Sequence, residues 1–216
     1  MAHRFAEAGM SVVLADIEAE PLAMAEAGLR EKGAKTIALR SNVMHEHDIQ
    51  QLADAAFSTF GNVHVLCNNA GVAGGSGMPA PGILNAWESP LSDWEWVFGV
   101  NFMGVLHGVR AFVPRMIANG EEGHIVNTAS IAGLVPGFGA PYDASKHAVV
   151  ALSENLYTQM QMLGGKPGGG GSGGNLALGS ANLTLSSGSA SYGGVISGTG
   201  RLIKTGSGTQ TLTAAN

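Results

Sequence analysis

Cysteine is almost absent from this sequence, since Cys67 is the only one. A single thiol excludes an internal disulfide framework and is typical of a reducing compartment, so we expect a cytoplasmic protein. Basic residues are also few: 11 Lys and Arg stand against 16 Asp and Glu, which gives a net charge of −5. This balance predicts no basic surface, and therefore no nucleic-acid partner and no acidic membrane as a partner.

Long apolar runs and metal-ligand patterns are also missing. No uninterrupted run of about 18 apolar residues occurs, so no transmembrane helix is expected. The opening stretch "MAHRFAEAGMSVVLAD" has charges too early for a secretory signal. His107, His124 and His147 lack the paired spacing of metal ligands, so we expect no metal site.

Charge and glycine are distributed unevenly along the chain. From Pro167 onward the only charged residues are Arg201 and Lys204, and 16 of the 33 glycines lie from Gly164 to the end. The stretch "GGKPGGGGSGG" has the composition of a flexible linker. We therefore expect three parts: a globular domain at 1–163, a Gly-rich linker at 164–174 and a β-repeat segment at 175–216.

The first part alternates between strand-like and helix-like patterns. Short apolar, β-branched runs are typical of buried parallel strands, and they are separated here by stretches with helical periodicity. Such alternation predicts an α/β fold with a doubly wound parallel sheet covered by helices on both faces. The expected strands are "SVVLAD", "TIALRSNV", "VHVLCNNAG" and "GHIVNTAS", and the expected helices include 92–119 and 142–163.

Ligands of such folds bind at the carboxyl ends of the strands. The positions at which to look for chemistry are therefore Asp16, Asn42, Asn68–Gly71 and Thr128–Ser130. Tyr142 and Lys146 follow shortly after the last of these.

Tyr142 and Lys146 are four residues apart and share one face of the expected helix. An ammonium group beside a phenol favours the phenolate, which can act as an acid/base group toward a hydroxyl. The same spacing also fits an ordinary surface pair. Ser130 and Asn101 favour the first interpretation, because a hydroxyl can donate to a carbonyl held near the phenol and a buried amide can hold a water.

Five motifs, "LADI", "NNAG", "VNFMG", "IVNTAS" and "YDASK", occur in the order and spacing of one family. Residues 1–163 resemble the short-chain dehydrogenases/reductases. The resemblance implies a Rossmann-type fold, hydride transfer between a nicotinamide cofactor and a small alcohol or ketone substrate, and an oligomer. It also implies roles for four residues: Tyr142 as general acid/base, Ser130 orienting the substrate oxygen, Lys146 favouring the ionised tyrosine and binding ribose, and Asn101 holding a relay water.

The resemblance also implies a set of cofactor-binding residues. Asp16 ends a strand where its carboxylate would accept from ribose hydroxyls and repel a 2′-phosphate, so NAD is expected rather than NADP. A helix N-cap role fits the same aspartate. The other positions implied are Asn42, Val43, Asn69, Ala70, Gly71, Tyr142 and Lys146, with Asn42 replacing a more usual aspartate.

The domain is expected to be incomplete. A Gly-rich phosphate-binding turn roughly 20 residues before Asp16 would fall ahead of Met1, together with the first strand. The "GGGGSG" at 168–173 fits that pattern but follows no strand, and we reject it. Past the last helix the substrate wall and much of the oligomer surface are also expected to be missing. We therefore expect weak NAD binding and little turnover.

The tail alternates apolar and small polar residues between glycines. Its expected strands are "LTL", "GVIS", "RLIK" and "TLTA". This segment resembles the β-strand repeats of autotransporter passenger domains, which stack as parallel β-solenoids. Two alternatives to an enzyme follow: a non-catalytic fusion or misread product of a dehydrogenase fragment, and a surface module whose function resides in the repeat.

Overall fold

The computed structural model describes residues 1–74 and 85–162, together with six short strands between residues 176 and 212. The expected linker at 164–174 and the rejected "GGGGSG" stretch lie outside the described residues.

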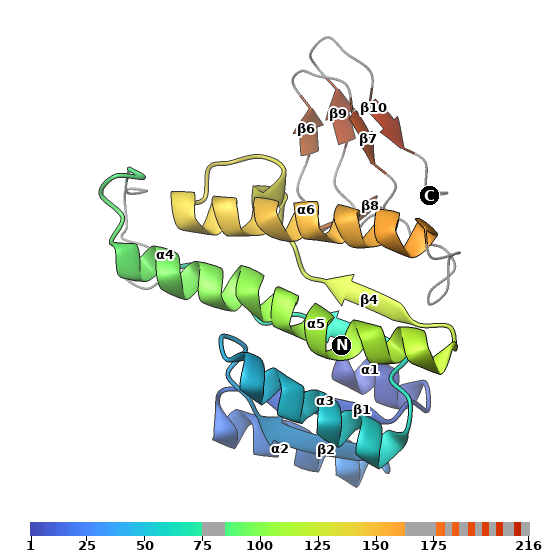
Figure 1. The fold of residues 1–216 in the computed structure, drawn as a ribbon. Coiled ribbons are helices and arrows are strands. Elements are labelled where there is room, and N and C mark those ends of the chain that lie inside the picture. The colour runs from blue at the N-terminus through green and yellow to red at the C-terminus, as the bar shows by residue number, and fades with distance from the viewer. Residues whose placement is uncertain are drawn as a thin grey trace.

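The first half alternates helices with strands, as its sequence pattern predicts (Figure 1). The loops at Gly9 and Gly33 have φ of 82° and 79°, a conformation that glycine adopts without strain and that ends the preceding helices. The elements are α1 (Ala2–Glu7), β1 (Val12–Asp16), α2 (Ala19–Glu31), β2 (Thr36–Arg40), α3 (Glu46–Phe60) and β3 (Val65–Asn68).

The second half is dominated by two long helices that lie side by side (Figure 1). The helix expected over 92–119 is confirmed, but it contains one π-helical turn, η1 (Gly99–Met103), between α4 (Leu91–Phe98) and α5 (Gly104–Asn119). The strand β4 (His124–Asn127) follows, and then a 3₁₀ turn, η2 (Ile131–Gly133), that the sequence pattern does not predict. The last helix is α6 (Ala140–Met162).

The strands of the α/β domain form two parallel pairs. β1 pairs with β2 from Val12 opposite Thr36 onward, and β3 pairs with β4 from Val65 opposite His124 onward. Within 1–74 and 85–162 the two pairs are not hydrogen-bonded to each other. The parallel pairing of strands that alternate with helices confirms the α/β architecture. Between β1 and β3 lies a cavity, at the place where hydrogen bonds would join the strands of a continuous sheet.

The hydrophobic core centres on α5, which packs against α3 and β3. Burying a large apolar side chain stabilises a fold by about 1.5–3 kcal/mol, so this helix contributes much of the stability. Leu91–Asn119 is apolar and long enough to cross a membrane by length and composition alone, but half of the stretch is buried inside the fold. The apolar side chains that Leu91–Asn119 contributes to the core are Val105, Val109, Ala111, Phe112, Val113 and Met116.

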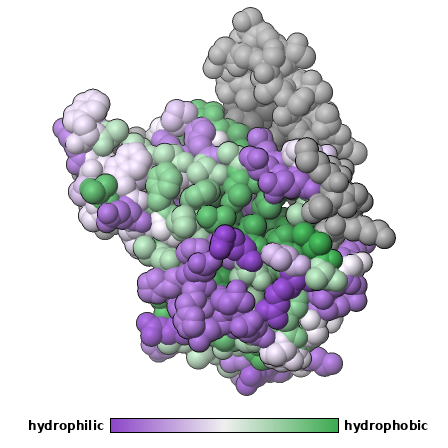
Figure 2. All heavy atoms as spheres, viewed as in Figure 1, coloured by the Kyte–Doolittle hydropathy of each residue, from purple (hydrophilic) through white to green (hydrophobic). Residues whose placement is uncertain are grey.

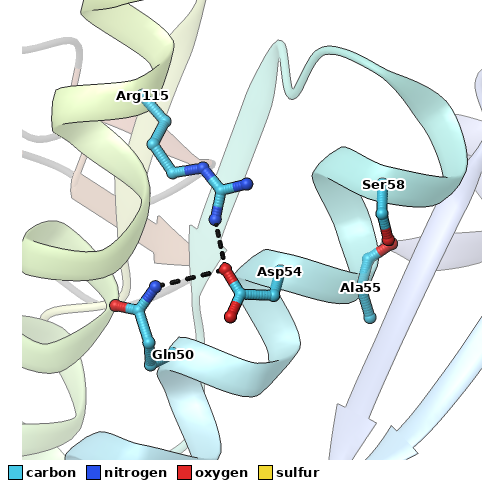
Figure 3. Close-up of polar contacts among 5 residues, drawn as sticks. All are labelled: Gln50, Asp54, Ala55, Ser58 and Arg115. Atoms are coloured by element: carbon cyan, nitrogen blue, oxygen red, sulfur yellow. Dashed lines mark hydrogen bonds and ion pairs between the residues drawn. The ribbon is translucent and has the colours of Figure 1, made fainter.

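An exposed polar cluster joins α5 to α3 outside the core (Figure 3). Arg115 Nη1 lies 2.7 Å from Asp54 Oδ1, which also accepts from Gln50 Nε2 at 3.3 Å. The Arg115 guanidinium also lies 4.1 Å from the centre of the Phe57 ring. Exposed ion pairs contribute about 0.2–1 kcal/mol, so this cluster adds little to the core. On the face shown in Figure 2, polar side chains gather over α3 and apolar ones over α4 to α6.

Each expected tail segment contains or overlaps a strand. In each of three parallel pairs, a strand is bonded to the third strand after it: β5 to β8, β6 to β9, and β7 to β10. The bounds are β5 (Leu176–Gly179), β6 (Leu183–Leu185), β7 (Ala190–Tyr192), β8 (Ile196–Gly198), β9 (Leu202–Lys204) and β10 (Gln210–Leu212).

Candidate active site

Tyr142 and Lys146 lie on the same face of α6, with Lys146 Nζ 5.7 Å from the centre of the Tyr142 ring. Lys146 is only 4% exposed and Tyr142 is half-buried. Lys146 Nζ donates to the carbonyl oxygen of Thr128, just after β4, at 2.9 Å. The buried lysine and this bond exclude the ordinary surface pair that the sequence left open.

Burial lowers the pKa of Lys146 below its ordinary value of 10.5. The physical cause is desolvation, which disfavours the charged ammonium form. No ion pair with a carboxylate offsets this effect among residues 1–74 and 85–162.

Lys146→Met should raise the free energy of unfolding at pH 7 by about 1 kcal/mol, because it removes a buried charge from the folded state. Since the lysine's pKa is lower in the folded chain than in the unfolded chain, the unfolded chain binds more protons between the lowered value and 10.5. Stability of the native sequence should therefore rise with pH through that window, and Lys146→Met should lose this part of the rise. Urea unfolding between pH 7 and 10 measures both effects.

Lys35→Met is the matched control, because Lys35 is exposed. It should leave both the stability and its pH dependence within about 0.5 kcal/mol of the native sequence. Equal pH slopes for the native protein and Lys146→Met would contradict the assignment of the effect to Lys146.

Ser130 is held beside α6 by the unpredicted 3₁₀ turn. Its Oγ caps η2 by accepting from the N–H of Ala132 at 3.2 Å, which leaves the hydroxyl hydrogen to donate. The turn packs directly on α6, since a Cβ added at Gly133 would lie 2.7 Å from the carbonyl oxygen of Lys146. The serine and the Tyr142–Lys146 pair therefore belong to two elements in tight contact.

Asn101 lies in the π turn and is completely buried. Its Oδ1 accepts from the N–H of Val72 at 2.8 Å, and its Nδ2 donates to the carbonyl oxygen of Val72 at 2.9 Å and to Ser145 Oγ at 3.0 Å. The expected role was an amide that holds a water. In the structure both amide hydrogens bind protein acceptors, so the side chain clamps the segment after β3 to α6 and only Oδ1 retains capacity for a water.

Gly71 lies between the expected catalytic residues Asn101 and Lys146 and the expected cofactor-binding residues of the cavity. A Cβ added there would lie 3.4 Å from Asn101 Oδ1 and 3.5 Å from Lys146 Nζ. The backbone after β3 therefore runs directly past the amide and the ammonium, and glycine leaves the space above them open.

A cavity of about 690 Å³ extends from this point to the carboxyl ends of β1 and β2. Its volume is in the range of small-molecule and cofactor sites. Trp96 of α4 also lines the cavity. The cavity brings together six of the expected cofactor residues: Asp16, Asn42, Val43, Asn69, Ala70 and Gly71.

Asp16 is exposed at the end of β1, with Oδ1 accepting from the N–H of Glu18 at 3.0 Å. That contact is a local turn before α2 and differs from the helix N-cap role left open by the sequence, because the N-cap residue of α2 is Glu18, which has no side-chain capping bond. Asn42 differs from its expected role, because its Oδ1 accepts from the N–H of Met44 at 3.0 Å and is thereby engaged in a local turn. The carbonyl of Val43 is likewise held, 2.9 Å from His107 Nδ1.

The lining suits part of a dinucleotide. Asp16 offers an acceptor for ribose hydroxyls at one end. Gly71 lines the other end, and Lys146, which is not itself among the lining residues, lies beside Gly71. In the ranges 1–74 and 85–162, however, no glycine-rich turn opens a helix at this cavity, so the described residues leave the phosphates without their usual anchor. The expectation of weak cofactor binding rests on this difference.

Two site residues were not singled out from the sequence: Gly133 and Ser145. Thr128, one of the strand-end positions singled out, enters the site through its carbonyl. Ser145 lies inside "YDASK", and that position was the available signal. Cys67 is half-buried on β3, where burial raises the pKa of its thiol, as expected of a core cysteine. Within the part of the chain that the structure describes, no cluster of His, Cys, Asp and Glu could hold a metal ion.

Comparison with known proteins agrees with this geometry. The family model described as short chain dehydrogenase matches residues 1–164. The 1-deoxy-11-beta-hydroxypentalenate dehydrogenase of Streptomyces avermitilis is 42% identical over 154 residues, which are 71% of this chain and 55% of the relative. The chain thus spans about half the length of the curated relatives it matches.

Two solved structures carry the same fold. A short chain dehydrogenase/reductase from Burkholderia phymatum in complex with NAD has a TM-score of 0.71 and 50% identity, over 77% of this chain and 57% of that one. NAD⁺-bound xylitol dehydrogenase has a TM-score of 0.67 and 33% identity, over 74% and 59%. This chain belongs to the short-chain dehydrogenase family.

Proposed function

We propose that this chain carries the acid/base site of an oxidoreductase that transfers hydride between NAD(H) and an alcohol or carbonyl carbon. The observation that carries the proposal is the Tyr142–Lys146 pair, in which a buried ammonium with a lowered pKa lies against the phenol ring. The family's relatives are dehydrogenases of alcohols by their names, which supports the substrate class.

In the oxidation direction Tyr142 accepts the hydroxyl proton of the substrate while hydride leaves the adjacent carbon. The ammonium of Lys146 favours the phenolate that accepts this proton, and Ser130 donates a hydrogen bond to the substrate oxygen as it becomes a carbonyl. Bound NAD would supply the hydride acceptor. Asn101 and Gly71 keep the backbone beside Lys146 in place during this transfer.

NAD is proposed rather than NADP because of Asp16. Its carboxylate stands exposed at the end of β1, where a ribose would lie and where the 2′-phosphate of NADP would meet a negative charge. Fluorescence titration of the full chain with NADH and NADPH tests this preference, and tighter binding of NADPH would contradict it.

Tyr142→Phe should reduce alcohol-dependent NADH formation to the background rate while leaving NADH affinity nearly unchanged, since only the acid/base hydroxyl is lost. A panel of cyclic secondary alcohols at high NAD concentration is a suitable probe. Tyr157→Phe is the matched control, because Tyr157 lies on the same helix beyond the site.

Turnover that survives in Tyr142→Phe but is lost in Tyr157→Phe would overturn the assignment. Micromolar NADH affinity in the native chain would show that the expectation of weak binding is wrong, without affecting the proposal for Tyr142.

We also infer that 175–216 is a β-solenoid-like repeat joined to the dehydrogenase part. Support comes from the three parallel pairs β5–β8, β6–β9 and β7–β10, in each of which a strand is bonded to the third strand after it in the sequence. A cytoplasmic location is part of the same proposal and rests on the single cysteine.

A further inference from the structure

The imidazole of His107 is a buried titratable group that the proposed reaction does not use. His107 lies on α5 and is only 7% exposed. Its Nδ1 lies 2.9 Å from the carbonyl oxygen of Val43, in the loop 41–45 that joins β2 to α3 and that we call the cofactor loop. Val43 lines the cavity of about 690 Å³ at the candidate active site (the active-site cavity), whereas His107 does not. The histidine therefore acts on the site only through this loop.

The contact with Val43 determines which imidazole nitrogen carries a hydrogen. A carbonyl oxygen can only accept, so Nδ1 of His107 donates to it. The neutral ring with its hydrogen on Nδ1 and the protonated ring both provide this donor, so either form can make the bond. The imidazole is thus suited to holding a backbone carbonyl in a fixed place.

The helix that carries His107 also contacts the cofactor loop through apolar groups. A Cβ added at Gly104 would lie 2.9 Å from Val43 Cβ, and one added at Gly99 would collide with Met44 Cε. Neither glycine has a side chain that would separate the loop from the helix backbone, so Val43 and Met44 pack directly against it. One polar and two apolar contacts therefore join two consecutive loop residues to the same helical segment.

The cofactor loop has further hydrogen bonds of its own. Asn42 Oδ1 accepts from the N–H of Met44 at 3.0 Å, and the N–H of Asn42 donates to Asp48 Oδ2 of α3 at 2.9 Å. These bonds fix the turn and its approach to α3, but they do not place it relative to α5. The bond from His107 to Val43 does so, because it joins the backbone of the loop to a side chain of that helix.

Loss of the imidazole would leave the Val43 carbonyl without this partner. A polar group that loses its partner inside a protein regains one by moving toward water, since remaining unpaired is costly. Asp16, Asn42 and Val43 line the same cavity, so a movement of Val43 would change the cavity wall at the end where Asp16 lies. Cofactor affinity is the property that should respond.

We propose that His107 is a positioning residue for the cofactor loop: by holding the carbonyl of Val43, it keeps the cavity wall near Asp16 in the shape that binds the cofactor. The expected effect on affinity rests on the proposed NAD-dependent function. The placement of the loop by His107 does not, and it is measured separately.

The test compares three substitutions of His107 in the full chain. His107→Asn retains a donor at the place of Nδ1, because both nitrogens are attached to Cγ. His107→Gln carries its donor one bond further out, and His107→Leu has none. NADH affinity, measured by calorimetry, should weaken at least about tenfold in the Leu and Gln variants, a factor that corresponds to about 1.4 kcal/mol, and should stay within about threefold of the native value in His107→Asn.

Amide hydrogen exchange, followed by NMR without cofactor, reports on the loop itself. In His107→Leu the amide of Met44 should exchange at least about tenfold faster than in the native chain, because local opening of the loop becomes easier, and His107→Asn should restore the slow exchange. The amide of Ser41, which donates to the carbonyl of Asp16, is an internal control that should change less. Unchanged exchange at Met44 in His107→Leu would overturn the proposal.

Met116→Ala controls for a general loss of stability. Met116 is a core residue nearer the C-terminal end of α5 and does not line the active-site cavity, so this variant should unfold at lower urea concentration while its NADH affinity stays within about threefold of native. Equal losses of affinity in Met116→Ala and His107→Leu, or no rescue by His107→Asn, would overturn the proposal. If the native chain bound no NADH, the proposed cofactor would be wrong, and exchange at Met44 would still decide whether His107 holds the loop.

Discussion

Gly133→Ala should lower the free energy of unfolding by about 2–3 kcal/mol. The added Cβ would lie 2.7 Å from the carbonyl oxygen of Lys146 and 2.9 Å from Val150 Cγ2. The first of these atoms belongs to the backbone of α6, so it cannot rotate away, and η2 must separate from α6. Urea unfolding measures the loss, which should also disturb the placement of Ser130 relative to Tyr142.

Gly28→Ala is the matched control for this substitution. Gly28 lies within α2 with no atom within 4 Å of an added Cβ, so alanine should stabilise the protein by about 0.5–1 kcal/mol through helix propensity. Opposite signs at the two glycines are the expected result. A neutral Gly133→Ala would show that η2 and α6 adjust easily and that their contact does not fix the site.

Asn101→Ala should lower the free energy of unfolding by about 2–3 kcal/mol, because it removes a completely buried amide and leaves the N–H and C=O of half-buried Val72 without these partners, while Ser145 Oγ keeps its bond to the carbonyl of Tyr142. The loss should be accompanied by faster hydrogen exchange at the Val72 amide, which a general loss of packing alone would not single out. Together these readouts separate a clamp from a residue that is merely buried.

Asn155→Ala provides the comparison, since Asn155 is exposed on α6 and donates only to the carbonyl of Ala151. Its effect should stay within about 0.5 kcal/mol. If Asn101→Ala had an equally small effect, the hydrogen bonds to Val72 and Ser145 would not matter to the fold, and the clamp interpretation would fail.

Features that depend on local pattern were predictable from the sequence. The strands β1 to β4 and the helices α2, α3 and α6 follow from apolar periodicity, and the Tyr142–Lys146 pair follows from a spacing of four residues. Asp16 and Gly71 were found because the ends of parallel strands meet at one edge of a sheet. Both residues line the same cavity.

Features that depend on contact between distant segments could not be predicted. Position 133 requires glycine because an added Cβ would collide with Lys146 and Val150. Both residues come more than ten positions later in the sequence and approach Gly133 only in the folded chain. The side chain of Asn101 is committed to Val72 and Ser145 by the same kind of contact, so the sequence indicates a buried amide but not its partners. The side chain of Asn42 likewise accepts a hydrogen bond from Met44 in its own loop, a contact that the sequence pattern does not indicate.

The π turn at Gly99–Met103 sets the rotational phase between α4 and α5. Each residue of an α-helix advances the chain by about 100° around the axis, and a π turn holds one more residue than an α turn. One residue inserted into a regular helix would rotate α4 by about 100° relative to α5. The π turn takes up that residue within a single turn, so α4 keeps its phase relative to α5 and Trp96 of α4 lines the active-site cavity together with Val105, Gly108 and Phe112 of α5.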